Sequence, residues 1–135
     1  MICSVNILAV AIATVASFVI GMIWYTPLTF GKSWMREVGL EGKEISKQAQ
    51  MKGFSLSFLT AIIQSVGIAY AMCLLGWQGP LAGIKLGIFA SLFFVATTIG
   101  MNYAYEQRSF KLFLINAGYN LVYFVIIGAI IGAMQ

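Results

Sequence analysis

Four long apolar stretches alternate with short polar segments along this chain of 135 residues. They cover about residues 2–25, 54–76, 81–103 and 110–134. A helix needs about 20 apolar residues to cross the hydrocarbon core of a bilayer, and each stretch reaches that length. Only 9% of the residues are charged, whereas soluble domains carry roughly a quarter. The sequence therefore predicts an all-α integral membrane protein: one domain, formed by a bundle of four antiparallel helices.

Basic residues concentrate at one end of this predicted bundle. Seven of the eight lie in the segments 26–53 and 104–111, which share one membrane face if the chain crosses four times. They are Lys32, Arg36, Lys43, Lys47, Lys52, Arg108 and Lys111, and the eighth is Lys85. Because short loops rich in lysine and arginine stay in the cytoplasm, we expect this face to be cytoplasmic and both termini to lie outside.

The composition also excludes several kinds of site. The chain has no histidine and no aspartate, which removes the commonest general base and the commonest nitrogen ligand of metals. Cys3 and Cys73 have no metal-ligand spacing. We expect no catalytic residues, no metal and no cofactor. The net charge of +4 does not indicate nucleic acid, since the basic residues sit where they would meet anionic lipid.

The two cysteines leave one question open. Both fall near the predicted outer face, where an oxidising compartment would permit a disulfide. The simpler interpretation is a pair of buried thiols that pack as small apolar side chains.

Small residues at four-residue spacing mark close helix contacts in lipid. The third stretch has the clearest series: Gly79, Gly83, Gly87 and Ser91, and then Ala96, Gly100 and Ala104. The fourth stretch ends with Gly128 and Gly132. These residues could pack helices within one bundle or between copies of the chain. The change of register after Ser91 suggests two contact faces on one helix, which predicts a homo-oligomer, a dimer or a trimer.

Polar side chains inside spans are costly and are candidates for function. Asn116, Tyr119 and Asn120 share one face of the fourth stretch. The turn between the last two stretches brings further polar side chains to a similar depth. The predicted polar pocket comprises Asn102, Glu106, Arg108, Asn116, Tyr119, Asn120, Trp24 and Tyr25. The simpler explanation for Glu106 and Arg108 is an ion pair that caps the turn.

Three segments resemble a family of small bacterial membrane proteins. They are VNILAV at 5–10, GMIWYTPLTFGKSWM at 21–35 and NYAYEQRSFKLFLINAGY at 102–119. The family carries only a number, domain of unknown function seventeen sixty-one. The resemblance extends over essentially the whole chain and implies a four-helix protein of the bacterial inner membrane. It implies no activity.

Three kinds of function remain open. The one that best fits the sequence is a non-enzymatic membrane protein that oligomerises or binds lipid or a partner. The alternative is a small-solute transporter or channel with its polar cluster on the cytoplasmic side of spans three and four, where a small-molecule ligand would bind. However, no carboxylate lies deep in any span, as proton-coupled carriers usually require. The third is a membrane enzyme with Glu106 as base and Arg108 as anion clamp.

Overall fold

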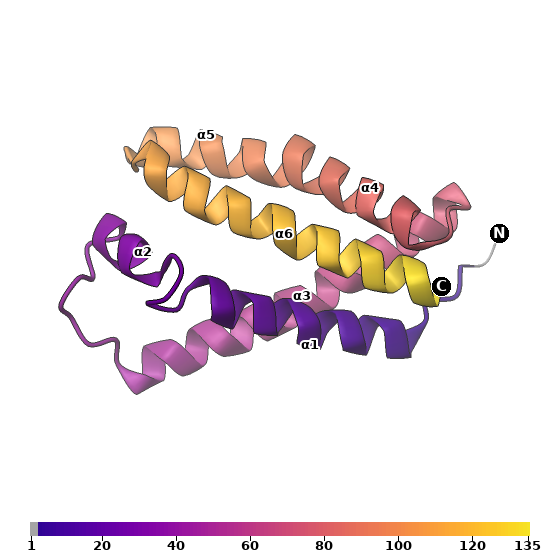
Figure 1. Cartoon of the computed structure of the whole chain (residues 1–135), viewed down its shortest axis with the longest axis horizontal. Coiled ribbons are helices and arrows are strands. Elements are labelled where there is room, and N and C mark those ends of the chain that lie inside the picture. Colours follow the sequence, from indigo (N-terminus) through magenta and orange to yellow (C-terminus); the bar gives the residue numbers. More distant parts are fainter. Residues whose placement is uncertain (1–2) are drawn as a thin grey trace.

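Four long helices form the protein in a computed structural model that describes residues 3–135 (Figure 1). The elements are α1 (Ile7–Trp24), α2 (Gly31–Glu37), α3 (Lys47–Leu75), α4 (Pro80–Ala90), the π-helix η1 (Ser91–Ala96), α5 (Thr97–Glu106) and α6 (Phe110–Met134). Helices α4, η1 and α5 are continuous, so the four candidate membrane spans are α1, α3, this composite helix and α6. The predicted all-α bundle of four apolar helices is confirmed.

Capping residues explain where three of the long helices begin. The side chains of Asn6, Ser46 and Ser109 each accept a hydrogen bond from a backbone N–H three residues further on, at the starts of α1, α3 and α6. Proline opens α4 at Pro80, where its missing N–H costs nothing. Gly76 ends α3 in the left-handed conformation, with φ of 65°.

Two helix starts differ from the predicted spans. The first helix begins at Ile7 rather than near residue 2, because Asn6 caps it and residues 3–6 lie outside the helix; residue 2 itself is outside the described residues. The second of the four long helices, α3, begins at Lys47, seven residues before the predicted span. Its polar first turns continue the apolar helix as an extension, so α3 is 29 residues long.

The π-helical turn changes which small residues share a face of the third span. An i→i+5 turn accommodates one additional residue, and Ala96 follows Ser91 by five positions. Gly87 lies against the backbone of α6, and Gly100 lies against Phe113, which is also on α6. At Gly87 and Gly100 the span therefore faces the same neighbouring helix, and the expectation of two contact faces has no support at these positions. Ala104, the last residue of the second series, is exposed.

Helices α4 and α6 approach until their backbones touch. A Cβ atom added to Gly83, Gly87, Gly128 or Gly132 would overlap backbone atoms of the opposite segment. At the end of this interface, the Gly79 N–H donates a hydrogen bond of 3.1 Å to the Gly132 carbonyl. Ser91 is buried where α4 passes into η1. The glycines of the two helices therefore make their close contact inside one chain.

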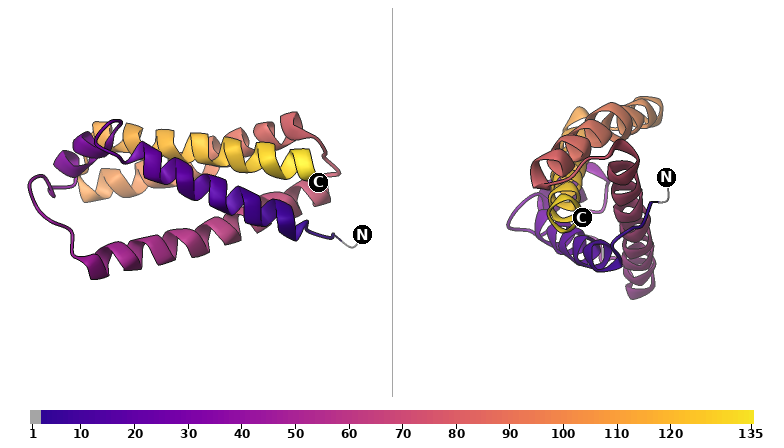
Figure 2. Two further views of the ribbon diagram at one scale, coloured as in Figure 1. Left: turned by 60° about the horizontal axis from the view of Figure 1, so that its bottom comes forward. Right: turned by 90° about the vertical axis from the view of Figure 1, so that its right-hand side faces the viewer.

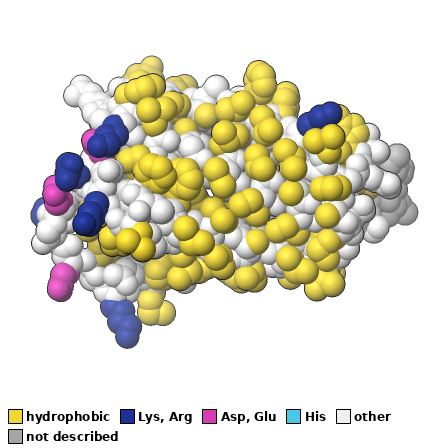
Figure 3. Space-filling model, viewed as in Figure 1, with side chains coloured by type: hydrophobic (Ala, Val, Ile, Leu, Met, Phe, Trp, Pro, Cys, Tyr) yellow, Lys and Arg dark blue, Asp and Glu magenta, His cyan; other side chains and the backbone are white. Residues whose placement is uncertain are grey.

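Helix α3 leaves the bundle towards one end of the molecule. Its residues 51–60 are all exposed, whereas Ala61, Ser65, Ala69 and Met72 further along are buried. Figure 2 shows α3 separated from α1 at one end and close to it at the other. The wider end carries the segments 26–53 and 104–111 with their charged residues, and a broad apolar belt covers the middle of the face seen in Figure 3. We call this wider end the basic end.

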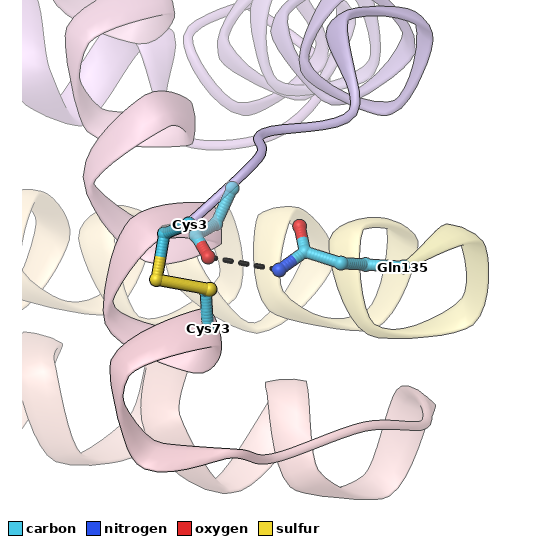
Figure 4. The surroundings of a disulfide bond; sticks show 4 residues. Cys3, Cys73 and Gln135 are labelled. Atoms are coloured by element: carbon cyan, nitrogen blue, oxygen red, sulfur yellow. Dashed lines mark hydrogen bonds between the residues drawn. A yellow bond between two sulfur atoms is a disulfide. The ribbon is translucent and has the colours of Figure 1, made fainter. Parts of the chain in front are cut away.

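A disulfide fixes α3 at the opposite end, which we call the disulfide end (Figure 4). It joins Cys3 to Cys73, with 5.8 Å between their Cα atoms. Of the two interpretations left open, the disulfide is the one that the structure has, because residues 3–6 carry Cys3 beyond α1 to the last turn of α3. Gln135 Nε2 donates a 2.9 Å hydrogen bond to the Ala69 carbonyl, and Asn6 Nδ2 donates one of 2.8 Å to the last turn of α6.

Candidate functional site

The residues predicted to form one polar pocket separate into two groups. Trp24, Tyr25, Asn116, Tyr119 and Asn120 are half-buried where the basic ends of α1 and α6 meet. Asn102, Glu106 and Arg108 are exposed, on α5 and on the turn that follows it. A similar depth in the membrane therefore does not bring the two groups into one site.

Asn116 is the centre of a hydrogen-bond network that joins three helices. Its Oδ1 accepts a 2.6 Å hydrogen bond from the Tyr25 hydroxyl, and its Nδ2 donates one of 2.6 Å to the hydroxyl of Tyr103 on α5. Asn120 instead donates to the Asn116 carbonyl of its own helix, at 2.8 Å. Tyr103 was not predicted, because adjacent helical residues point in different directions and Asn102 occupied the predicted face.

Aromatic rings pack around this network at the basic end. The Trp24 indole donates a 3.1 Å hydrogen bond to a carbonyl of α6, and its ring centroid lies 4.6 Å from that of Phe30. Tyr25 lies between two further rings, with centroids 5.2 Å from Tyr119 and 5.7 Å from Trp34 of α2. These contacts hold the end of α1 against both α6 and the surface helix α2.

Glu106 and Arg108 form an ion pair at the molecular surface. Their charged atoms are 3.7 Å apart, and about half of each side chain is exposed. A pair of this kind contributes only about 0–1 kcal/mol. Between them Gln107 adopts a left-handed conformation, with φ of 58°, and ends α5. These features fit an ion pair at a turn better than a binding pocket. Asn102 makes no side-chain hydrogen bond within the described residues.

A cleft opens between α1, α3 and α6 near the basic end, where α3 leaves the bundle. Its volume is about 390 Å³. The lining residues are Phe18, Gly21, Met22, Tyr25, Phe54, Ser57, Ala61, Tyr119 and Tyr123. Sequence patterns did not reveal this cleft, because it depends on the angle of α3 rather than on any spacing along the chain. The sequence signal for it was a pair of tyrosines four positions apart, Tyr119 and Tyr123.

Three tyrosines form one wall of the cleft. The ring centroid of Tyr119 lies 5.2 Å from that of Tyr25 and 5.5 Å from that of Tyr123. The Tyr123 hydroxyl donates a 2.6 Å hydrogen bond to Gln64 Oε1 on α3, beneath the cleft. The Tyr119 hydroxyl has no hydrogen-bond partner within residues 3–135 and lies beside Gly21, at 2.9 Å from the place of a Cβ. This hydroxyl is therefore available to a molecule in the cleft.

A second hollow adjoins the cleft on the far side of Tyr25, which lines both. It lies at the basic end of the bundle and holds about 680 Å³. Its lining residues are Tyr25, Pro27, Gly31, Lys32, Met35, Arg36, Glu41 and Gly42. Gly31 is buried, and a Cβ there would overlap the backbone of Tyr25 and Thr26, so glycine permits the tight return of α2 over the end of α1.

The two hollows together present binding groups rather than reactive ones. The cleft offers aromatic and aliphatic surface with hydroxyls, and the surface hollow adds two cations and one carboxylate. Within the described part of the chain, no three acidic or cysteine side chains are placed to hold a metal ion. The arrangement suits an amphipathic molecule with one apolar and one polar end.

Comparison with known proteins identifies a family but no characterised relative. Neither a curated protein nor a solved structure matches the chain. The model of DUF1761, described as a protein of unknown function, matches residues 8–132. The match includes the aromatic segment at the end of α1, the turn before α6 and every residue that lines the cleft. The chain therefore belongs to the DUF1761 family of proteins of unknown function.

Proposed function

We propose that this protein binds lipid, without catalysis, in the cleft between α1, α3 and α6. The observation that carries the proposal is the divergence of α3, which leaves an apolar opening of about 390 Å³ within the membrane-spanning part. Pockets for small ligands hold about 300–1,000 Å³. In a bilayer the molecules adjacent to such an opening are lipids, so a lipid acyl chain is the ligand that it would bind.

The chemistry of the lining favours a lipid over a polar solute. Four aromatic or aliphatic side chains from α1 and α3 face the cleft (Phe18, Met22, Phe54 and Ala61), and its polar groups are hydroxyls. The available Tyr119 hydroxyl is suited to donate to an ester carbonyl. A transporter for polar solutes has less support, since Oδ1 and Nδ2 of Asn116 already form hydrogen bonds with tyrosine hydroxyls. Glu106 does not line the cleft, which weakens the enzyme hypothesis.

The same proposal includes the bacterial inner membrane as the location, with the basic end in the cytoplasm. Seven of eight basic residues at that end support this orientation. The disulfide lies at the other end, which would face the oxidising periplasm, and this supports it independently. A dimer or trimer stays a separate prediction; the glycines of α4 lend it no support, because they face α6 of the same chain.

A matched pair of substitutions on α3 tests lipid binding. Ser57 lines the cleft, whereas Ser55 is equally classed as exposed but does not line it. We expect Ser57→Trp to fill the cleft and Ser55→Trp to leave it open. Native mass spectrometry of protein extracted with its own lipids would measure the fraction that carries a lipid. That fraction should fall in Ser57→Trp only, with the thermal unfolding of both variants near that of the wild type.

Two results would contradict the proposal. One is a wild-type protein that retains no lipid under gentle extraction. The other is equal lipid retention in Ser57→Trp and Ser55→Trp, which would mean that bound lipid coats the apolar belt rather than the cleft.

A further inference from the structure

The cleft and the surface hollow are neighbouring sites with different chemistry, and they share one lining residue. Tyr25 is the shared wall between them. The inner end is apolar, and the outer end carries Lys32 and Arg36. A phospholipid has the same division, with acyl chains attached to a phosphate headgroup. Because Tyr25 lines both hollows, a lipid whose chain occupies the cleft would have its headgroup beside the surface hollow.

The charges of the hollow are unbalanced towards the positive. Two cations face one carboxylate, Glu41, which leaves one net positive charge. Arg36 pairs with Glu41 at 3.4 Å, but both side chains are more than 60% exposed, so water and ions compete readily for this pair. Lys32 is in no ion pair within the described part of the chain. An anionic group in the hollow could therefore pair with Lys32 directly and with Arg36 in exchange for Glu41.

Three contacts hold the helix α2, which carries these cations. Trp34 packs its ring against the edge of Tyr25. One turn further along α2, Glu37 accepts a 2.7 Å hydrogen bond from the Ser109 hydroxyl at the start of α6. The tight turn at Gly31 fixes where the helix begins. The helix that carries the two cations therefore has a defined position at the end of α1.

The membrane environment makes the headgroup decisive. An acyl chain that enters the cleft leaves hydrocarbon of similar polarity, so the cleft itself discriminates little between lipids that share the same chains. Each lysine or arginine near the surface favours anionic over neutral lipid by about fivefold. Selection among lipids must then come mainly from the hollow.

We propose that the ligand is an anionic phospholipid, whose phosphate headgroup contacts Lys32 and Arg36 while one acyl chain occupies the cleft. The inference rests on the proposed function, because it assumes that the cleft takes the chain. It adds the headgroup class, and it assigns Lys32 and Arg36 as the residues that determine specificity.

A competition between two lipids with identical acyl chains tests the headgroup class. Purified full-length protein would receive equimolar phosphatidylglycerol and phosphatidylcholine, and native mass spectrometry would give the ratio bound. We expect the wild type to favour phosphatidylglycerol by about fivefold or more. Lys32→Gln combined with Arg36→Gln should bring the ratio close to one while total binding persists. Both side chains are exposed, so their loss should leave the fold intact.

Two further variants sharpen this test. Lys111→Gln removes a basic residue of the same end that does not line the hollow, and the ratio should stay at the wild-type value. Glu41→Gln removes the carboxylate that competes for Arg36, so the preference for phosphatidylglycerol should increase. Opposite shifts on neutralising a cation and an anion of the same hollow would identify the hollow as the headgroup site.

The possible failures are distinguishable. If the wild type binds both lipids equally and Ser57→Trp loses both, the headgroup inference is overturned and the lipid-binding proposal stands. If neither lipid binds, the lipid-binding proposal falls and takes the inference with it. If inorganic phosphate alone removes the preference and Ser57→Trp leaves it unchanged, the hollow is a site for soluble phosphate and the inference is likewise overturned.

Discussion

Replacing Gly83 with alanine is the most direct test of how the bundle is held together. The new Cβ would overlap the Gly128 carbonyl, and both sides of this contact are backbone, so no side chain can rotate away. The helices must move apart instead. A gap of about 0.5–1 Å forfeits a quarter to a half of the attraction in each contact that it opens. Overpacking of this kind costs about 1–3 kcal/mol.

Gly67→Ala on α3 is the matched control, because no atom lies within 4 Å of the position of its Cβ. It should gain about 0.5–1 kcal/mol, since alanine is the better helix former. For a chain of this size 1 kcal/mol corresponds to about 4 °C in Tm. Thermal unfolding followed by circular dichroism should therefore show a fall of about 4–12 °C for Gly83→Ala and a small rise for Gly67→Ala.

Either of two results would contradict the close contact of Gly83 with α6. Equal Tm values for Gly83→Ala and Gly67→Ala would mean that the α4–α6 interface is looser than the structure has it. A Gly83→Ala protein that unfolds like the wild type but loses self-association would mean that this glycine contacts a second copy of the chain rather than α6.

Two further predictions concern the ends of the bundle. Cys3→Ser should lower Tm, because the disulfide closes a loop with a sequence separation of 70 residues, for which the chain-entropy model gives at most about 4 kcal/mol; identical gel migration of the wild type with and without reductant would contradict the bond itself. Asn116→Leu should cost about 1–3 kcal/mol, because two tyrosine hydroxyls lose their partner. Asn102→Leu should change the free energy of unfolding by less than about 0.5 kcal/mol, since Asn102 is exposed; thermal unfolding that gives equal losses for both asparagines would exclude the network as the cause.

The sequence by itself determined the class of the protein and the end at which its charges gather. Both follow from composition within windows of about 20 residues, and no contact between distant residues is needed to read them. The aromatic and polar residues that end α1, and those on the first half of α6, were also recognisable, since their spacing along each helix is local.

Tertiary structure decided which of these residues meet. Asn102 and Asn116 were predicted at similar depth, but depth leaves the direction around a helix undetermined, and only Asn116 joins the network. The direction of Gly100 on the third span was misread because the π-turn that begins at Ser91 breaks the ordinary 3.6-residue period. The disulfide needed the extended residues 3–6 to bring Cys3 to α3.

The cleft is the feature that only the fold could establish. A helix in lipid is apolar on every side, so its sequence carries no amphipathic pattern that separates a buried face from one that meets lipid. The sequence pattern of α3 therefore does not predict that residues 51–60 leave the bundle while Ala61 and the turns beyond it stay inside. That divergence depends on how α3 packs against α1 and α6 as a whole, and it creates the proposed binding site.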